Sequence, residues 1–169
     1  MSPAHRRYLL LEQGVGAAVV NFMLNAGIAA LMFRGAATVP LWGQQSIAGD
    51  TIGTTFLLPL ITCLIVTPLA QRQLRAGTLS GLGWTRSSHP MLGLLPRRTF
   101  PRGLALGVIC VVLAAPASIL TLGAFQVAAM SFGQFVLCKA AFAAVLGAVV
   151  TPVIALWAIA EAQSTEQAA

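Results

Sequence analysis

Four long apolar stretches, separated by short polar segments, constrain this chain more than any other feature. They cover residues 14–33, 52–70, 104–125 and 132–158. A helix needs about 20 residues to cross a hydrocarbon core roughly 30 Å thick, and each stretch has that length or nearly so. None carries a charge in every turn, as the wet face of a soluble helix would. The sequence therefore predicts an all-α fold, an integral membrane four-helix bundle forming a single transmembrane domain over residues 1–169.

The charge content supports lipid as the main surroundings of the chain. Only 8% of the residues are charged and 57% are hydrophobic, whereas soluble domains carry roughly 25% charged residues. The net charge of +6 would suit nucleic acid. However, the basic residues cluster between apolar stretches, and no aromatic-interleaved basic helix or binding motif is present. We therefore expect the lipid bilayer, and no nucleic acid, as a partner.

The loops predict how the helices are oriented. Residues 34–51 hold one arginine and one aspartate, and residues 126–131 hold no charge. The segment 71–103 instead holds six arginines: Arg72, Arg75, Arg86, Arg97, Arg98 and Arg102. Short arginine-rich loops stay cytoplasmic, so both termini and this loop are expected inside. We expect the loop, with Trp84, to lie against anionic lipid headgroups. The first stretch is long for a signal peptide, so we expect it to be retained.

A short motif recurs in the two halves of the chain. Thr67-Pro68 ends the second apolar stretch and Thr151-Pro152 lies near the end of the fourth. Both pairs are expected at the cytoplasmic end of helices that run in the same direction. The chain is therefore either two tandem parallel hairpins, as in some transporters, or a sequence in which Val-Thr-Pro recurs by chance.

The first hairpin also resembles a known kind of domain. The run from Asn21 to Gly27, followed by Trp42, Pro59, Pro68 and Arg72, is similar to small bacterial two-helix inner-membrane domains of unknown function. The resemblance covers residues 15–75 on scattered positions. It implies a multi-pass protein of a bacterial inner membrane, and it implies no activity.

Small residues spaced four apart mark faces on which helices pack closely. Such faces matter in lipid, because apolar burial does not drive membrane helices together. Three pairs have this spacing: Gly14 and Ala18, Gly103 and Gly107, and Ala143 and Gly147. We expect them to serve packing within the bundle, with a homo-oligomer or a membrane-protein partner as the alternative.

Polar residues inside the apolar stretches are the candidates for function. Most are expected in the middle or the outer half of the bilayer, and Asp50 at the outer mouth. The set is Asn21, Asn25, Asp50, Thr55, Thr62, Ser118, Thr121, Gln134 and Lys139. Polar groups in hydrocarbon need partners, so these faces should meet inside the bundle. They either form interhelical hydrogen bonds that fix the fold or line a polar cavity.

Lys139 is the most informative member of this set. A lysine at mid-bilayer is costly, and Lys139 is the only lysine of the chain. Three roles are open for it. It can extend its amine to the headgroups, pair with Asp50, or face a ligand as an anion-binding or proton-relaying group.

No sequence pattern indicates enzymatic chemistry. The chain lacks a nucleophile elbow, a P-loop, a dinucleotide fingerprint and HExxH. Cys63, Cys110 and Cys138 have no metal-ligand spacing and are expected to be small apolar fillers. We therefore expect a non-enzymatic protein without cofactor or metal. The leading hypothesis is a small permease-like or channel-like protein, and the alternative is an accessory or structural membrane protein that binds another subunit or lipid.

Overall fold

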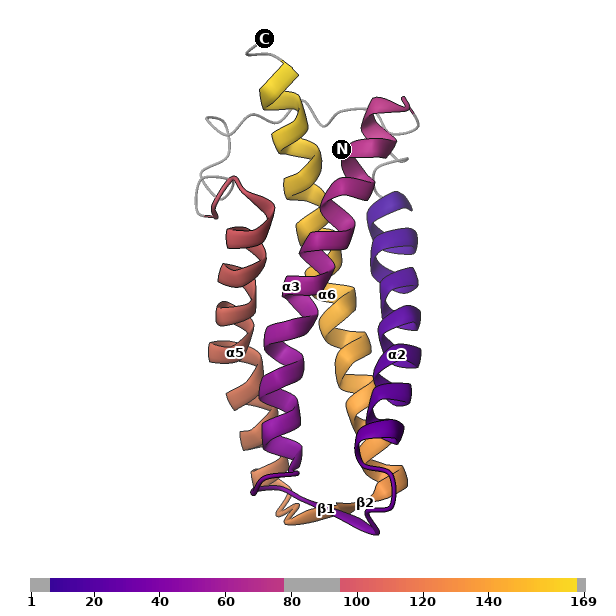
Figure 1. The fold of residues 1–169 in the computed structure, drawn as a ribbon, viewed down its shortest axis with the longest axis vertical. Helices are drawn as coiled ribbons and strands as arrows, with labels where there is room; N and C mark the ends of the chain where they lie inside the picture. Colours follow the sequence, from indigo (N-terminus) through magenta and orange to yellow (C-terminus); the bar gives the residue numbers. More distant parts are fainter. Residues whose placement is uncertain (1–6, 78–94, 167–169) are drawn as a thin grey trace.

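The computed structural model describes residues 7–77 and 95–166, and their regular structure is almost entirely helical (Figure 1). A π-helical segment, η1 (Tyr8–Gly16), runs directly into α2 (Ala17–Met32). Three further helices follow: α3 (Ile47–Arg75), α5 (Thr99–Ala124) and α6 (Phe132–Glu166). Within the described ranges, four helices, counting η1 and α2 as one, are long and apolar enough to cross a membrane. This confirms the all-helical prediction and the four apolar helices.

Side chains define where two of these helices begin. Ser46 precedes α3, and its Oγ accepts a hydrogen bond from Gly49 N at 3.2 Å. At the start of α6, Gln134 N donates to Ser131 Oγ at 3.4 Å while Ser131 N donates to Gln134 Oε1 at 3.0 Å. The second arrangement is a capping box, which satisfies two backbone donors that a helix start leaves free.

The helices pack in the order α5, α3, α6, α2, with α3 and α6 at the centre (Figure 1). The chief partner of α2 is therefore α6, although α3 follows α2 in the chain. In the same way α5 packs on α3 rather than on α6, which follows it. The two helices of each hairpin thus diverge. The first helix of each hairpin, α2 or α5, packs on the second helix of the other hairpin, α6 or α3.

A two-stranded antiparallel ribbon closes one end of the bundle. Its strands are β1 (Thr38–Pro40) and β2 (Ala129–Ser131), with Val39 opposite Met130. We call this the strand end (Figure 1). The opposite end, where α3 finishes and α5 begins, carries four exposed arginines and is called the basic end: Arg72, Arg75, Arg97 and Arg98. The ribbon was not predicted, because each strand is only three residues long.

The buried core lies along the contact between α3 and α6. Its largest part includes Leu58, Leu146 and Ile154, with Leu106 reaching in from α5. A second cluster around Tyr8 and Ile159 fills the basic end, and a third around Phe33 and Phe135 fills the strand end. The outward faces of the helices carry large exposed apolar side chains such as Leu31, Val112 and Leu137. Lipid-facing helices have this character, whereas helices of a soluble bundle expose charge.

The helices reach beyond their predicted bounds at the basic end. α3 ends at Arg75 rather than at residue 70, α5 begins at Thr99 rather than at 104, and α6 ends at Glu166 rather than at 158. The first helix begins at Tyr8 rather than at residue 14. The prediction followed hydrophobicity alone, whereas a helix continues through arginines and glutamines. At the C-terminal end of α3, Arg72 and Arg75 also interact favourably with the helix dipole. The predicted loop 71–103 is therefore shorter, and its residues Trp84 and Arg86 lie outside the described residues.

Candidate functional site

A buried ion pair joins the two central helices near the strand end. Lys139 Nζ of α6 contacts Asp50 Oδ1 of α3, and the side chains are only 4% and 8% exposed. Asp50 stands in the first turn of α3, where the positive end of the helix dipole favours a carboxylate. Of the three roles open to Lys139, the structure therefore shows the pairing with Asp50. A charge-paired lysine is far less costly in hydrocarbon than an isolated one.

Two grooves flank this ion pair and share it. The first, called the α2/α3 groove, is about 480 Å³ in volume and lies where α2 and α3 diverge. The second, called the α5/α6 groove, is about 460 Å³ and lies where α5 and α6 diverge. Asp50 and Lys139 line both grooves. The ion pair is therefore the polar partition between two cavities.

The predicted polar cluster is divided between these grooves. Asn21, Asn25 and Thr62 line the α2/α3 groove. Ser118 and Thr121 line the α5/α6 groove. Thr55 belongs to neither, because it is fully buried in α3. The structure thus separates residues that the sequence placed in one group, since the α3–α6 contact lies between them.

Most of these polar groups hydrogen-bond to their own helix. Asn21 Nδ2 donates to Ala17 O at 2.9 Å, and Asn25 Nδ2 donates to Asn21 O at 3.0 Å. The hydroxyls behave in the same way, each donating to the carbonyl four residues earlier: Thr51, Thr55, Ser118 and Thr121. Within the described part of the chain, these donors make none of the interhelical hydrogen bonds that one interpretation expected. The two asparagine side chains line the α2/α3 groove with one N–H of each carboxamide already donated to their own helix.

Gln134 does not contribute to a polar cluster in the way the sequence analysis assumed. Its side chain closes the capping box at the start of α6 and is exposed. The pattern Ser-x-x-Gln before an apolar stretch is the signature of this cap, and it was available in the sequence at Ser131 and Gln134. Gln134 therefore fixes the end of a helix.

Glycines set the two outer helix contacts. A β-carbon at Gly107 would lie 2.8 Å from Phe56 O of α3, and one at Gly103 would lie 3.2 Å from Cys63 Cβ. On the other side of the bundle, a β-carbon at Gly147 would lie 3.2 Å from Asn21 Cβ of α2. All three positions are thus in close contact with the neighbouring helix. Of the other small residues, Ala143 is fully buried, Gly14 is buried in η1, and Ala18 is half-buried.

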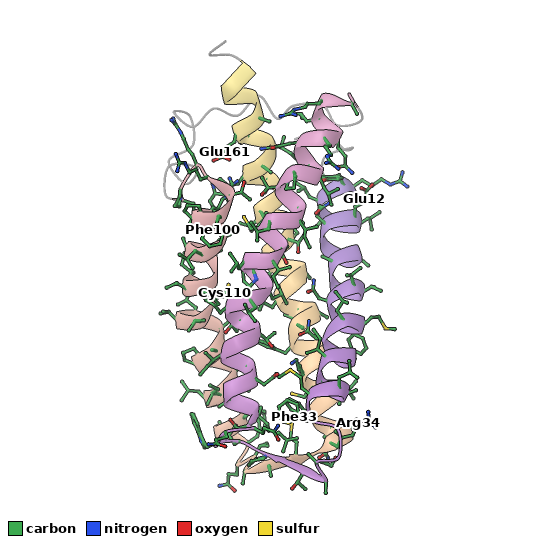
Figure 2. The ribbon with its side chains drawn as sticks, viewed as in Figure 1. Glu12, Phe33, Arg34, Phe100, Cys110 and Glu161 are labelled. Atoms are coloured by element: carbon green, nitrogen blue, oxygen red, sulfur yellow. The ribbon has the colours of Figure 1, made fainter. Side chains whose placement is uncertain are left out.

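A second ion pair, at the basic end, was missed by the sequence analysis. Arg102 Nη1 donates to Glu161 Oε2 at 2.6 Å, and Arg102 is completely buried. Figure 2 shows Glu161 on α6 near the beginning of α5. The hydrophobicity pattern predicts that Arg102 belongs to the loop 71–103, whereas it lies in the first turn of α5. The sequence did contain a signal for this pair. Glu161 follows the fourth apolar stretch and Arg102 precedes the third, so both are expected at the same end of the bundle.

The remaining ionisable and sulfur groups are dispersed. Glu12 is exposed at the edge of the first helix (Figure 2). Cys63 is buried, and its Sγ donates to Thr99 O at 3.5 Å, which links α3 to α5. Among residues 7–77 and 95–166, no group of three or more His, Cys, Asp or Glu side chains could hold a metal ion. His5 and His89 lie outside these ranges.

Comparison of the chain with protein-family models, with curated proteins and with solved structures gave no match. The fold and the site therefore rest on this chain alone.

Proposed function

We propose that the chain is a permease-like, four-pass protein of a bacterial inner membrane, acting on a molecule that has a polar head and an apolar body. The observation that carries this proposal is the buried Asp50–Lys139 pair, which lines both grooves. Leu24, Ile28, Leu57 and Ile61 give the α2/α3 groove apolar walls, while the ion pair gives it a charged site. Such a combination suits an amphipathic molecule better than an ion or a sugar.

The proposed orientation places the grooves in the outer half of the bilayer. Exposed arginines gather at the basic end, and arginine-rich segments stay cytoplasmic. The strand end then faces the periplasm, and both termini are cytoplasmic. Trp42, which is 64% exposed beside β1, would lie at the outer interface, where its amphipathic ring is favoured.

The packing favours lateral access over an axial channel in a single copy. Leu58, Leu146 and Ile154 fill the contact between the central helices. Both grooves instead lie along the sides of the bundle, where α2 diverges from α3 and α5 from α6. A molecule would therefore enter from the outer leaflet. A homo-oligomer that surrounds a shared conduit remains part of this proposal.

The exchanged packing of the hairpins supports the proposal of two tandem parallel repeats. The Thr-Pro pairs are 84 positions apart, and Thr67 and Thr151 are both buried. The same spacing relates Cys63, where α5 crosses α3, to Gly147, where α2 crosses α6. Parallel repeats around a central site occur in transporters. The two halves differ at the ion pair. Residue 55, which lies 84 positions before Lys139, is a threonine and not a lysine.

The accessory-protein alternative has less support from the packing. Gly103 and Gly107, the most regular small-residue pair, are already covered by α3. A partner subunit or lipid that used this face would first have to displace α3.

Transport is tested in liposomes that contain the purified full chain, with a fluorescently labelled phosphatidylethanolamine as the probe. Dithionite quenches only the label in the outer leaflet, so the rate of further quenching measures movement across the bilayer. We expect the parent to accelerate this movement, and Asp50→Asn and Lys139→Met each to remove most of the acceleration. Gln134→Ala is the matched control, because that side chain caps α6 outside both grooves. A parent no faster than protein-free liposomes contradicts the proposal for this class of molecule.

A further inference from the structure

Arg102 is a fully buried cation whose hydrogen bonding is incomplete. Its Nη1 donates to Glu161 Oε2, and its side chain is 0% exposed. Its Nε and Nη2 are also buried, and neither has a hydrogen-bond acceptor within the described part of the chain. Buried polar groups are nearly always paired, and groups of a charged side chain are especially costly to leave unpaired. These two nitrogens therefore call for an acceptor.

The two unpaired nitrogens form one edge of the guanidinium group. The N–H groups of Nε and Nη2 point in parallel directions, at a spacing that matches two oxygens of a carboxylate or a phosphate. Glu161 engages the remaining nitrogen and leaves this edge unused. The geometry of the edge thus selects an oxyanion rather than a single carbonyl.

A second buried donor lies on α6, one helical turn before Glu161. Trp157 Nε1 is buried without an acceptor, and Trp157 precedes Glu161 by four residues. Residues spaced four apart share one face of a helix. The indole N–H can only donate, as can the guanidinium edge. Both groups therefore need the same kind of partner, one that supplies oxygen lone pairs.

The charge of the surroundings also favours an anion. Arg72, Arg75, Arg97 and Arg98 are exposed at the same end of the bundle. Glu161 offsets one positive charge, and the four exposed arginines leave the basic end strongly positive. Clustered charge of one sign raises the local concentration of ions of the opposite sign.

We propose that the basic end contains a binding site for one phosphate-type oxyanion, held by Nε and Nη2 of Arg102 with Trp157 Nε1 as a further donor. The shared chemistry is a phosphate group with at least two accessible oxygens. It can come from an anionic phospholipid of the adjacent leaflet or from free phosphate. This site is separate from the grooves and does not rest on the proposed transport.

Thermal unfolding of the purified full chain in detergent tests the site. The additions are phosphatidylglycerol, the phosphate-free lipid monoolein, sodium phosphate, and sodium chloride at matched ionic strength. We expect a saturable rise in Tm that monoolein and chloride do not give. A rise with phosphatidylglycerol alone identifies a lipid ligand, and a rise with sodium phosphate identifies the free ion. In either case Arg102→Lys, which keeps the charge but loses the edge, should weaken the apparent affinity about tenfold. Arg97→Lys is the exposed control and should match the parent.

Two results would overturn the proposal. One is a parent protein that neither phosphate nor phosphatidylglycerol stabilises beyond chloride and monoolein. The other is an Arg102→Lys variant that binds as tightly as Arg97→Lys. If Arg102→Lys does not fold, Trp157→Phe replaces it, because that change removes one N–H and keeps an aromatic ring. It should weaken binding about tenfold, as expected for one hydrogen bond to a charged acceptor, and unchanged affinity would then count against the site.

Discussion

At the scale of single residues, two ion pairs link the helices. Asp50–Lys139 joins α3 to α6 near the strand end, and Arg102–Glu161 joins α5 to α6 at the basic end. Asp50, Lys139 and Arg102 are buried, whereas the Glu161 side chain is 22% exposed. A buried charge stabilises a fold only when its partner is present, because the attraction then offsets the cost of removing the charge from water. The Asp50–Lys139 pair also lines the α2/α3 groove and the α5/α6 groove.

The Asp50–Lys139 pair should show strong coupling in a double-mutant cycle. Asp50→Asn or Lys139→Met alone leaves one uncompensated buried charge and should cost about 3–5 kcal/mol of the free energy of unfolding. The double variant leaves no charge and should recover much of that loss. Unfolding by sodium dodecyl sulfate in mixed micelles measures both values, with Glu12→Gln as the exposed control. Additive single and double effects would mean that the two charges are not coupled.

At the scale of elements, close glycine contacts determine how each outer helix approaches its central partner. The α3–α5 contact can adjust least, because a β-carbon at Gly107 would lie 2.8 Å from the backbone oxygen of Phe56. A backbone atom cannot turn aside as the end of a flexible side chain can. Any residue larger than glycine should therefore push α5 away from α3.

Gly107→Ala should destabilise the protein by about 1–3 kcal/mol, the usual cost of overpacking a well-packed contact. Gly123→Ala is the matched control in the same helix, because a β-carbon there meets nothing within 4 Å. The control should be neutral or slightly stabilising, since alanine favours a helix over glycine. The midpoint of sodium dodecyl sulfate unfolding compares the two variants. Equal midpoints would contradict the close contact between α5 and α3.

At the scale of the whole molecule, hydrophobicity predicted the helices but could not predict how they pair. Length and apolar content require only that residues 14–33 and the later stretches form helices, and the structure has these four. Which helices touch depends on contacts distant in sequence, such as Asn21 with Gly147. For the same reason the sequence grouped polar residues that the α3–α6 contact divides. It also left Arg102 in a loop, because its partner Glu161 is recognisable only once both helices are placed.

The exchanged packing of the two hairpins can be tested by disulfide formation. Gly103→Cys would place a β-carbon 3.2 Å from Cys63 Cβ, and a β-carbon at Gly147 would lie at the same distance from Asn21 Cβ. Both distances are a few tenths of an ångström shorter than the separation of about 3.5–4.5 Å found in disulfides, so each pair has to move apart slightly to form the bond. Gly103→Cys alone should therefore oxidise with the native Cys63. The double variant Asn21→Cys with Gly147→Cys should form a disulfide between its two new cysteines, in a background where Cys63, Cys110 and Cys138 are serine.

The matched control for these pairs is Leu24→Cys with Leu57→Cys in the same cysteine-free background. Both residues line the α2/α3 groove and lie on helices that are neighbours in the chain yet not packed together. Mild oxidation and intact-mass measurement, before and after reduction, report each cross-link. We expect intramolecular cross-links at Cys63–Gly103 and Asn21–Gly147 and little at Leu24–Leu57. The opposite pattern would mean that α2 packs on α3, which would close the α2/α3 groove and remove the lateral entry on which the proposed transport depends.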